Sequence, residues 1–192
     1  MNQGLVDVHF HGQGGLDVMA EDPEDLLRLS LRVARRGVAG FLATFISSPR
    51  KDILAGLENV KKVKGREKGA KILGVHLEGP FLHPDRKGAH NPAYLRPPDL
   101  KEVREWVAAG EGLVKLVTLA PELPGMTDVI RFLVKKGVRV SMGHTTADSR
   151  QALAGKRLGA RGVTHLFNAM NAMHHREPGL AGFALLDPDL YT

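Results

Sequence analysis

Short apolar segments alternate with longer amphipathic segments along most of the chain, and this alternation limits the folds open to it. Each segment with the composition of a buried strand is followed by one whose apolar residues recur at helical spacing. Such alternation requires parallel strands joined by helical crossovers, and so predicts an α/β fold. The predicted strands are residues 5–9, 38–45, 71–77, 113–119, 138–142 and 162–166, the predicted helices are residues 22–36, 48–63, 100–110, 127–136 and 147–158, and residues 168–192 show no clear helix.

Polar residues at the ends of these strands distinguish between two architectures. An open doubly wound sheet concentrates its functional residues around one switch point, whereas a (β/α) barrel brings the carboxyl ends of all its strands to one end. Histidine or glutamate follows the first, third, fifth and sixth predicted strands. We therefore predict a partial (β/α) TIM-type barrel with about six of the usual eight strands, which occupies residues 1–192 as one incomplete domain.

Composition excludes several classes of protein. The 192 residues include no cysteine and no long apolar run, which excludes a disulfide scaffold, a thiolate metal site and a membrane span. Residues 1–4 lack the basic and apolar pattern of a secretion signal, so we expect a cytoplasmic protein. The formal net charge of +6 is spread along helical segments, for example at Arg28, Arg32 and Arg35. This spread indicates solvated helix faces rather than a nucleic-acid surface.

One carboxylate and two imidazoles follow three separate predicted strands. A charge at the end of a buried strand, such as Glu78, is costly unless it is compensated, and a metal ion is a strong compensator. If the ends meet, Glu78, His144 and His165 would hold a divalent cation and leave a position for water, as in a hydrolytic site. The simpler alternatives are a helix-capping carboxylate and two hydrogen-bonded polar histidines.

A further pair of histidines, His9 and His11, stands at the end of the first predicted strand. Residues two apart on a strand point the same way, so both imidazoles could reach one ion. A lone pair with this spacing also arises by chance, and the sequence leaves both interpretations open.

Several groups near the strand ends could bind an anion. The guanidinium of Arg176 could clamp a phosphate or carboxylate with two hydrogen bonds, or it could pair with Glu177 on the surface. His90 lies in a long loop beside Lys87 and suits either an anion or solvent. The peptide groups at residues 168 and 169 could donate to an anion or only turn the chain.

The strings around these residues resemble the amidohydrolase superfamily and, within it, the N-acetylglucosamine-6-phosphate deacetylase family. The His-x-His pair is common to the superfamily, whereas the other strings are specific in combination, and the similarity covers nearly the whole chain. The strings that carry it are residues 7–12 (DVHFHG), 74–81 (GVHLEGPF), 87–92 (KGAHNP), 143–145 (GHT), 165–170 (HLFNAM) and 176–179 (REPG).

The resemblance implies hydrolysis of N-acetylglucosamine 6-phosphate to glucosamine 6-phosphate and acetate, in amino-sugar metabolism. The expected cofactor is one divalent metal ion, Zn²⁺ with Fe²⁺ as the alternative, which polarises the amide carbonyl and activates water. The resemblance also implies a homodimer or higher oligomer, in which the partner supplies the loop histidine. The implied metal ligands are Glu78, His144 and His165, with His9 and His11 available for a second ion; the implied substrate contacts are His90, Asn168, Ala169 and Arg176.

In the family that the chain resembles, an aspartate on a later strand, beyond the position of Thr192, acts as general acid and base. Asp187 and Asp189 do not stand at that motif position, so no catalytic residue is assigned within the chain. Two alternatives follow. The chain could be a non-catalytic metal-binding remnant stabilised by oligomerisation. It could also be another amidohydrolase, such as a cyclic-amide hydrolase, although those are expected to carry a carboxylated lysine where Glu78 stands.

Overall fold

The computed structural model describes residues 4–192, so the expectation about a secretion signal falls partly outside the described residues. The chain divides into two compact units. The first unit comprises the chain up to Leu77 together with Arg104–Lys115, and the second comprises Glu78–Val103 and Leu116–Thr192. The prediction of one domain over residues 1–192 stays a prediction.

Strand and helix alternate along the chain, which confirms the α/β class. The parallel strands follow the order β1-β4-β5-β6-β7-β8, the sequential order of a partial (β/α) barrel, as predicted. A short antiparallel hairpin that was not predicted from the sequence follows β1. The strands are β1 (Leu5–Phe10), β2 (Gly12–Gln13), β3 (Leu16–Asp17), β4 (Val38–Phe45), β5 (Lys71–Glu78), β6 (Val114–Leu119), β7 (Arg139–Met142) and β8 (Gly162–Val163).

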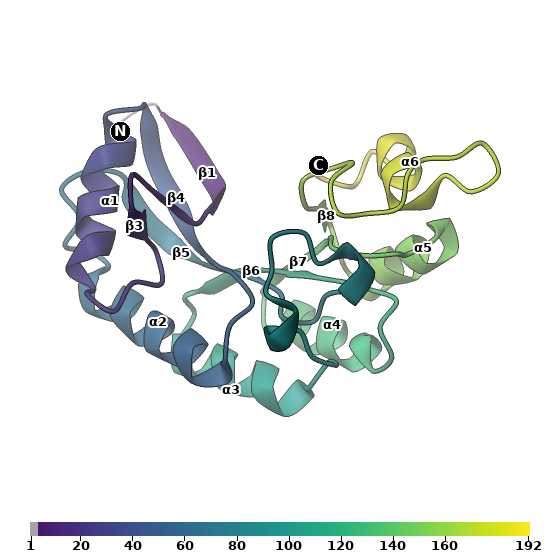
Figure 1. The fold of residues 1–192 in the computed structure, drawn as a ribbon, viewed down its shortest axis with the longest axis horizontal. Coiled ribbons are helices and arrows are strands. Elements are labelled where there is room, and N and C mark those ends of the chain that lie inside the picture. Colours follow the sequence, from purple (N-terminus) through teal and green to yellow (C-terminus); the bar gives the residue numbers. More distant parts are fainter. Residues whose placement is uncertain (1–3) are drawn as a thin grey trace. The chain divides into compact units, whose positions relative to one another are not determined.

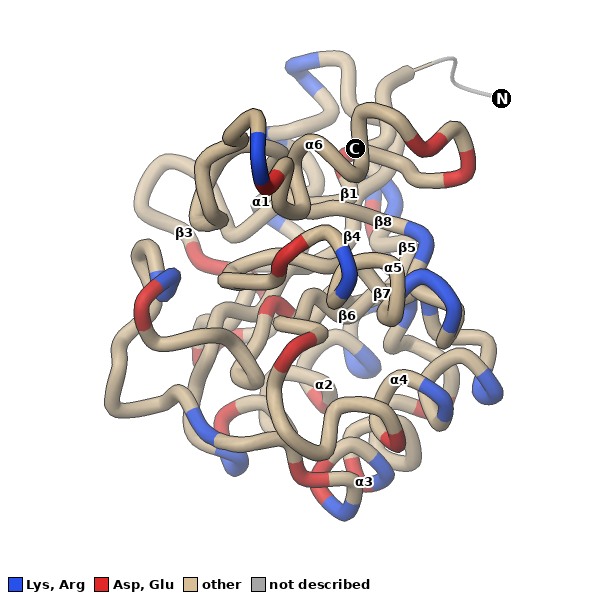
Figure 2. Tube along the Cα trace, turned by 90° about the vertical axis from the view of Figure 1, so that its right-hand side faces the viewer, with Lys and Arg blue, Asp and Glu red and all other residues tan. Residues whose placement is uncertain are grey.

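Within residues 4–192, six α-helices and two short 3-10 helices connect and follow the strands. The helices are α1 (Glu24–Ala34), α2 (Arg50–Val63), η1 (Pro84–Arg86), η2 (Pro92–Tyr94), α3 (Leu100–Gly110), α4 (Met126–Lys135), α5 (Ser149–Leu158) and α6 (Gly179–Leu186). None of those within residues 4–192 is long and apolar enough to cross a membrane. Figure 2 shows acidic and basic positions interleaved along the trace, in agreement with the charge distribution expected from the sequence.

In the first unit, helices α1 and α2 pack beside β4 and β5 (Figure 1). The apolar face of α2 is fully buried and consists of Ile53, Leu57, Val60 and Val63. On α1, Leu31 is 45% exposed, whereas the polar Ser30 is fully buried. The Ser30 hydroxyl donates to the carbonyl of Ala70 at 2.8 Å, which satisfies a polar group in the core.

In the second unit, helices α4, α5 and α6 accompany β7 and β8. Helix α5 begins at a capping box, in which the Asp148 side chain accepts from the Gln151 N–H and the Gln151 side chain accepts from the Asp148 N–H. The helix α6 contradicts the expectation of an irregular tail. Its sequence, GLAGFALL, is apolar on every side and therefore shows no amphipathic periodicity.

The last strand is shorter than predicted. The sequence indicated a strand over residues 162–166, whereas β8 ends at Val163. The reason is local: His165 adopts φ 37°, outside the extended region, so the strand cannot continue through it. The shorter strand releases His165 to turn away from the sheet.

Candidate metal centre

Glu78 is the last residue of β5 and the first of the second unit, and it is only 3% exposed. The chain that follows it is fixed against the end of β6. The Gly79 N–H donates to the Thr118 carbonyl at 3.0 Å, and the Ala120 N–H donates to the Phe81 carbonyl at 3.0 Å. Backbone hydrogen bonds on both sides of the turn therefore hold the carboxylate at the strand end, as the sequence predicted.

His144 and His165, which follow β7 and β8, meet this carboxylate. The Nε2 atom of His144 lies 3.1 Å from Glu78 Oε1, and that of His165 lies 3.3 Å from the same oxygen. The two Nε2 atoms are 2.9 Å apart. Three groups separated widely in sequence thus converge within the second unit.

The other nitrogen of each ring faces a backbone carbonyl. His144 Nδ1 lies 2.7 Å from the carbonyl of Arg86, and His165 Nδ1 lies 3.1 Å from that of Asn168. A carbonyl can only accept, so each Nδ1 carries the hydrogen and each Nε2 of a neutral ring presents a lone pair. Two lone pairs and a carboxylate oxygen then face one another, which is favourable only with a cation among them.

The donor set fits a divalent metal. One carboxylate and two neutral imidazoles, each oriented by an outer hydrogen bond, are ligands that Zn²⁺ accepts. Without a metal, a proton on one imidazole can supply part of the positive charge that the carboxylate and the lone pairs require. The hydrogen bond to Glu78 raises the pKa of His165 above its ordinary value, against a smaller opposing effect of burial.

His90 joins the same cluster, although its sequence context indicated either an anion or solvent as its partner. It is 2% exposed, and its Nε2 lies 3.4 Å from Glu78 Oε2. Its ring centroid is 4.5 Å from that of His144. Glu78, His90 and His144 form a buried group whose ligand atoms are close enough to share one ion.

The loop that carries His90 packs closely against the ring of His144. Gly88 adopts φ 55°, and a Cβ built there would lie 3.0 Å from His144 Cε1. Only glycine suits both the backbone conformation and the contact without displacing a neighbour. The loop and the imidazole are therefore fitted to each other.

The predicted pair His9 and His11 meets within the first unit. Their Nε2 atoms are 3.1 Å apart, and His11 Nδ1 lies 2.9 Å from the Thr44 carbonyl. The ring of His76, which is 1% exposed, stands 4.9 Å from that of His9. The structure thus brings the two imidazoles together at the end of β1, as their spacing predicted.

The remaining predicted contacts lie at and after the loop that follows β8. The Asn168 carbonyl accepts from His165, and the Ala169 carbonyl accepts from the Thr145 N–H at 3.1 Å. Arg176 is exposed in a turn closed by hydrogen bonds between His174 and Glu177. Glu177 accepts from the N–H groups of Ser149 and Gly179, and these bonds hold its pKa below its ordinary value.

One carboxylate of this region was missed at the level of the sequence. Glu122 follows β6 and accepts hydrogen bonds from Thr145 and Thr146, the two residues after His144. The reasoning that led to Glu78, a carboxylate at the end of a predicted strand, would also have led to Glu122. This residue stands three positions beyond Leu119, the last residue of β6.

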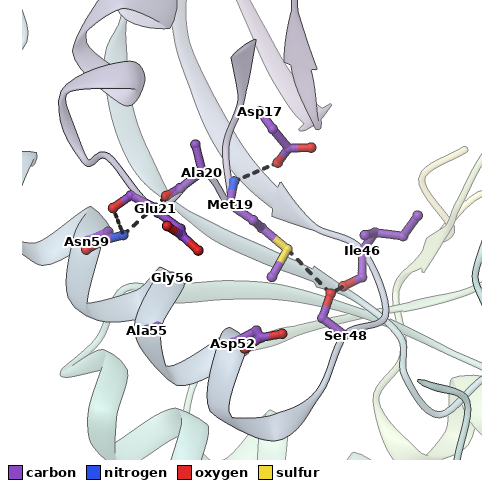
Figure 3. A pocket seen from close by; sticks show the side chains of 10 residues that line it. All are labelled: Asp17, Met19, Ala20, Glu21, Ile46, Ser48, Asp52, Ala55, Gly56 and Asn59. Carbon is purple, nitrogen blue, oxygen red and sulfur yellow. Dashed lines mark hydrogen bonds between the residues drawn. The ribbon is translucent and has the colours of Figure 1, made fainter. Parts of the chain in front are cut away.

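A pocket of about 480 Å³ lies in the first unit, between the hairpin loop and α2 (Figure 3). Asp17, Glu21 and Asp52 contribute carboxylates to its lining. Its other polar groups are occupied by the protein itself: the Asn59 amide donates to the carbonyls of Ala20 and Glu21, and the Ser48 hydroxyl donates to that of Ile46. None of the predicted site residues lines this pocket, so the histidine cluster remains the stronger candidate.

Comparison with known proteins agrees with this geometry. Residues 4–186 match the amidohydrolase family. The chain is 41% identical to N-acetylglucosamine-6-phosphate deacetylase from Bacillus subtilis (strain 168) over 193 residues, which cover 98% of this chain and 49% of the relative. It is 38% identical to N-acetylgalactosamine-6-phosphate deacetylase from Escherichia coli O157:H7, covering 95% of this chain and 48% of that one.

Solved structures give the same result. N-acetyl-D-glucosamine-6-phosphate deacetylase from Mycobacterium smegmatis superposes with a TM-score of 0.89 at 37% identity, covering 97% of this chain and 49% of that one. The corresponding enzyme from Thermotoga maritima gives 0.87 at 32% identity, covering 97% and 49%. The chain spans about half the length of the curated relatives it matches. With a family match over residues 4–186 and a glutamate–histidine cluster at its strand ends, the chain belongs to the amidohydrolase family.

Proposed function

We propose that the chain serves in the metal-dependent deacetylation of N-acetylglucosamine 6-phosphate, which yields glucosamine 6-phosphate and acetate. The observation that carries the proposal is the approach of two Nε2 atoms, 2.9 Å apart, to one buried carboxylate oxygen. The similarity to deacetylases of this substrate class supports it. A variant of the Mycobacterium smegmatis enzyme has been solved in complex with N-acetyl-D-glucosamine-6-phosphate.

In this proposal Glu78, His144 and His165 hold a divalent ion, Zn²⁺ or alternatively Fe²⁺, and His9 and His11 are available to a second. The metal would supply Lewis acidity, which polarises the amide carbonyl and makes water acidic enough to react at neutral pH. The carbonyls of Arg86 and Asn168 accept the Nδ1 hydrogens and so orient both imidazoles with Nε2 toward the ion. His90 stands beside the same carboxylate and is close enough to the reaction centre to orient the substrate.

Recognition of the phosphate falls to Arg176 with the backbone of Asn168 and Ala169. The guanidinium and the Ala169 N–H suit a phosphate because both offer directed hydrogen bonds to its oxygens, whereas the Asn168 N–H donates to the His165 carbonyl at 2.8 Å. Ala169 adopts φ 50°, a conformation that turns its peptide groups out of the strand direction. Arg176 is exposed and can therefore reach a ligand from solvent.

We assign no general acid or base among residues 4–192. The two carboxylates nearest the end of the chain are already engaged, because Lys156 Nζ donates to Asp187 at 2.7 and 2.6 Å and to Asp189 at 2.9 Å. The hydrogen bond from Lys156 also holds the pKa of Asp187 below its ordinary value, which makes it a poor proton donor. A homodimer and a cytoplasmic location remain predictions.

A second substrate belongs in the same experiment. The 38% identity to an N-acetylgalactosamine-6-phosphate deacetylase favours the corresponding galactose-configured sugar as the alternative. The proposed site residues contact the metal, the acetamide and the phosphate, and both sugars carry the same acetamide and phosphate groups.

The test combines binding with turnover. The metal-free chain is titrated with Zn²⁺ or Fe²⁺, and each loaded sample is assayed for acetate release from both sugar phosphates. Unphosphorylated N-acetylglucosamine and a cyclic amide serve as matched controls. We expect one tightly bound ion and metal-dependent binding of the 6-phosphates but of neither control. A folded, loaded chain that binds no sugar phosphate would contradict the proposal, whereas binding without turnover would indicate a non-catalytic metal-binding remnant.

A further inference from the structure

The carboxylate of Glu122 is surrounded by donors from the segment that carries His144. Its Oε1 accepts from the Thr146 N–H at 2.7 Å and from the Thr146 hydroxyl at 3.1 Å. Its Oε2 accepts from the hydroxyl of Thr145. Three donors from two consecutive residues therefore bind one side chain, and those residues directly follow His144.

The backbone at His144 is one that needs such support. His144 adopts φ 49°, a region that residues with a Cβ rarely occupy unless their surroundings impose it. Thr145 is fully buried, and its hydroxyl accepts from the Ala147 N–H at 2.9 Å while donating to Glu122. The hydroxyl therefore has no freedom to turn, and Glu122 fixes the turn that aims the imidazole.

The same segment is held from its other side by Asn171. The Asn171 amide donates to the Thr146 carbonyl at 2.7 Å, and its oxygen accepts from Arg86 Nη2 at 2.6 Å. The carbonyl of Arg86 is the one that accepts from His144 Nδ1 at 2.7 Å. The hydrogen bonds thus run from Glu122 through Thr146, Asn171 and Arg86 back to the imidazole.

We propose that Glu122 is a positioning residue for the metal centre, which acts by fixing the backbone and ring of His144 rather than by touching the metal. This inference rests on the proposed metal site. The conventional alternative is that Glu122 only stabilises the loop before α5. The two differ in one respect: a positioning residue changes the affinity and geometry of the metal site, whereas a structural one changes stability alone.

The test uses Glu122→Gln, which keeps the size of the side chain but leaves one oxygen to serve the donors that two oxygens serve now. Loss of a group that hydrogen-bonds a metal ligand directly lowers metal affinity by about 10- to 100-fold, and Glu122 acts one step further out, so a loss of about 10-fold, the lower end of that range, applies here. We expect this loss in Zn²⁺ affinity, measured by competition with a chelator, with the stoichiometry unchanged. In the Co²⁺-substituted protein, we expect a shift in the visible absorption spectrum.

The matched control is Glu102→Gln. Glu102 is a carboxylate of the second unit that is 3% exposed and accepts hydrogen bonds from Arg96 at 2.9 and 2.5 Å, at a distance in sequence from the segment that carries His144. This change should lower the melting temperature and leave Zn²⁺ affinity and the Co²⁺ spectrum as in the unaltered chain. Comparison of the two variants separates a general loss of stability from a displacement of the His144 imidazole.

Two outcomes overturn the inference. Wild-type Zn²⁺ affinity and an unchanged Co²⁺ spectrum in Glu122→Gln would assign the residue to stability alone. Should that variant fail to fold, Thr146→Val is the second test, because it removes one donor to the Glu122 carboxylate. We expect this variant to bind Zn²⁺ about 2- to 10-fold more weakly, and a smaller loss would contradict the inference. If the unaltered chain binds no Zn²⁺, the proposed metal site itself fails, and that result is distinct from either of these.

Discussion

The two histidine clusters differ in how they are assembled. His9 and His11 are neighbours on one strand, and their spacing alone brings the Nε2 atoms to 3.1 Å. In the second unit, Glu78, His144 and His165 come from three strand ends, and their two imidazoles are oriented by backbone carbonyls of the loops around them. A pair produced by local geometry needs no further explanation. Convergence of a charged group and two lone pairs from distant segments is costly, and it indicates selection for binding a cation.

The comparison is tested most directly by removing the charge at the centre of the second cluster. Glu78→Gln preserves the shape of the side chain but removes the negative charge that faces both imidazoles. Loss of an outer partner typically lowers metal affinity by about 10- to 100-fold, so loss of this ligand should lower it by more than that. Chelator competition measures the effect, and an unchanged affinity would remove Glu78 from the ligand set.

A second test asks whether the second unit also contains the proposed phosphate-binding residue, Arg176. Arg176→Ala should weaken binding of the sugar phosphate by about 10- to 100-fold, the range expected for a charge-assisted hydrogen bond. Titration calorimetry on the zinc-loaded chain measures this change. Arg139→Ala, an exposed arginine at the start of β7, removes the same charge from the opposite end of a strand and should have little effect. Equal losses in both variants would mean that net charge alone attracts the ligand.

A smaller effect is expected from protonation of His165, which places a positive charge beside Glu78 when no metal is bound and so stabilises the folded chain. Because Glu78 raises the folded-state pKa of His165 above 6.5, the stabilisation is fully present below about pH 6.5 and is lost as the pH rises through the raised value. The side chain is 26% exposed, so screening limits the fall in melting temperature to about 1–3 °C.

Thermal melts between about pH 6 and pH 9 measure this loss, and His165→Asn should flatten the curve. Zinc should reverse the trend, because it binds the neutral rings and its affinity therefore rises with pH. A metal-free chain whose stability increases over the same range would contradict the assignment.

The smallest effect is expected from the first cluster. Replacing both His9 and His11 with asparagine should lower the affinity for the first ion by less than Glu78→Gln does, because neither histidine is among the proposed ligands of that ion. The same double change should abolish any binding of a second ion. A large loss of the first ion would instead show that both clusters serve the same metal.

The positions of Glu78, His144 and His165 could be predicted because parallel strands align their carboxyl ends. The place of His90 could not, since it depends on a loop shaped by Gly88 against His144 and by the Asn91 side chain, which caps η2. The helix α6 escaped prediction because an entirely apolar segment has no period to detect. The early end of β8 escaped prediction because nothing in the composition of residues 162–166 signals the φ of 37° at His165, which takes the chain out of the extended region.

The contact of Gly88 with the imidazole of residue 144 has a practical consequence for protein engineering. Loops at the mouth of such folds are the usual place to exchange segments when a new specificity is wanted. In this chain an inserted segment must keep a bare Cα at this one point, whatever else it changes. A Cβ there would force the loop or the imidazole of His144 to shift by a few tenths of an ångström, and the change would be transmitted to the histidine that the metal proposal depends on.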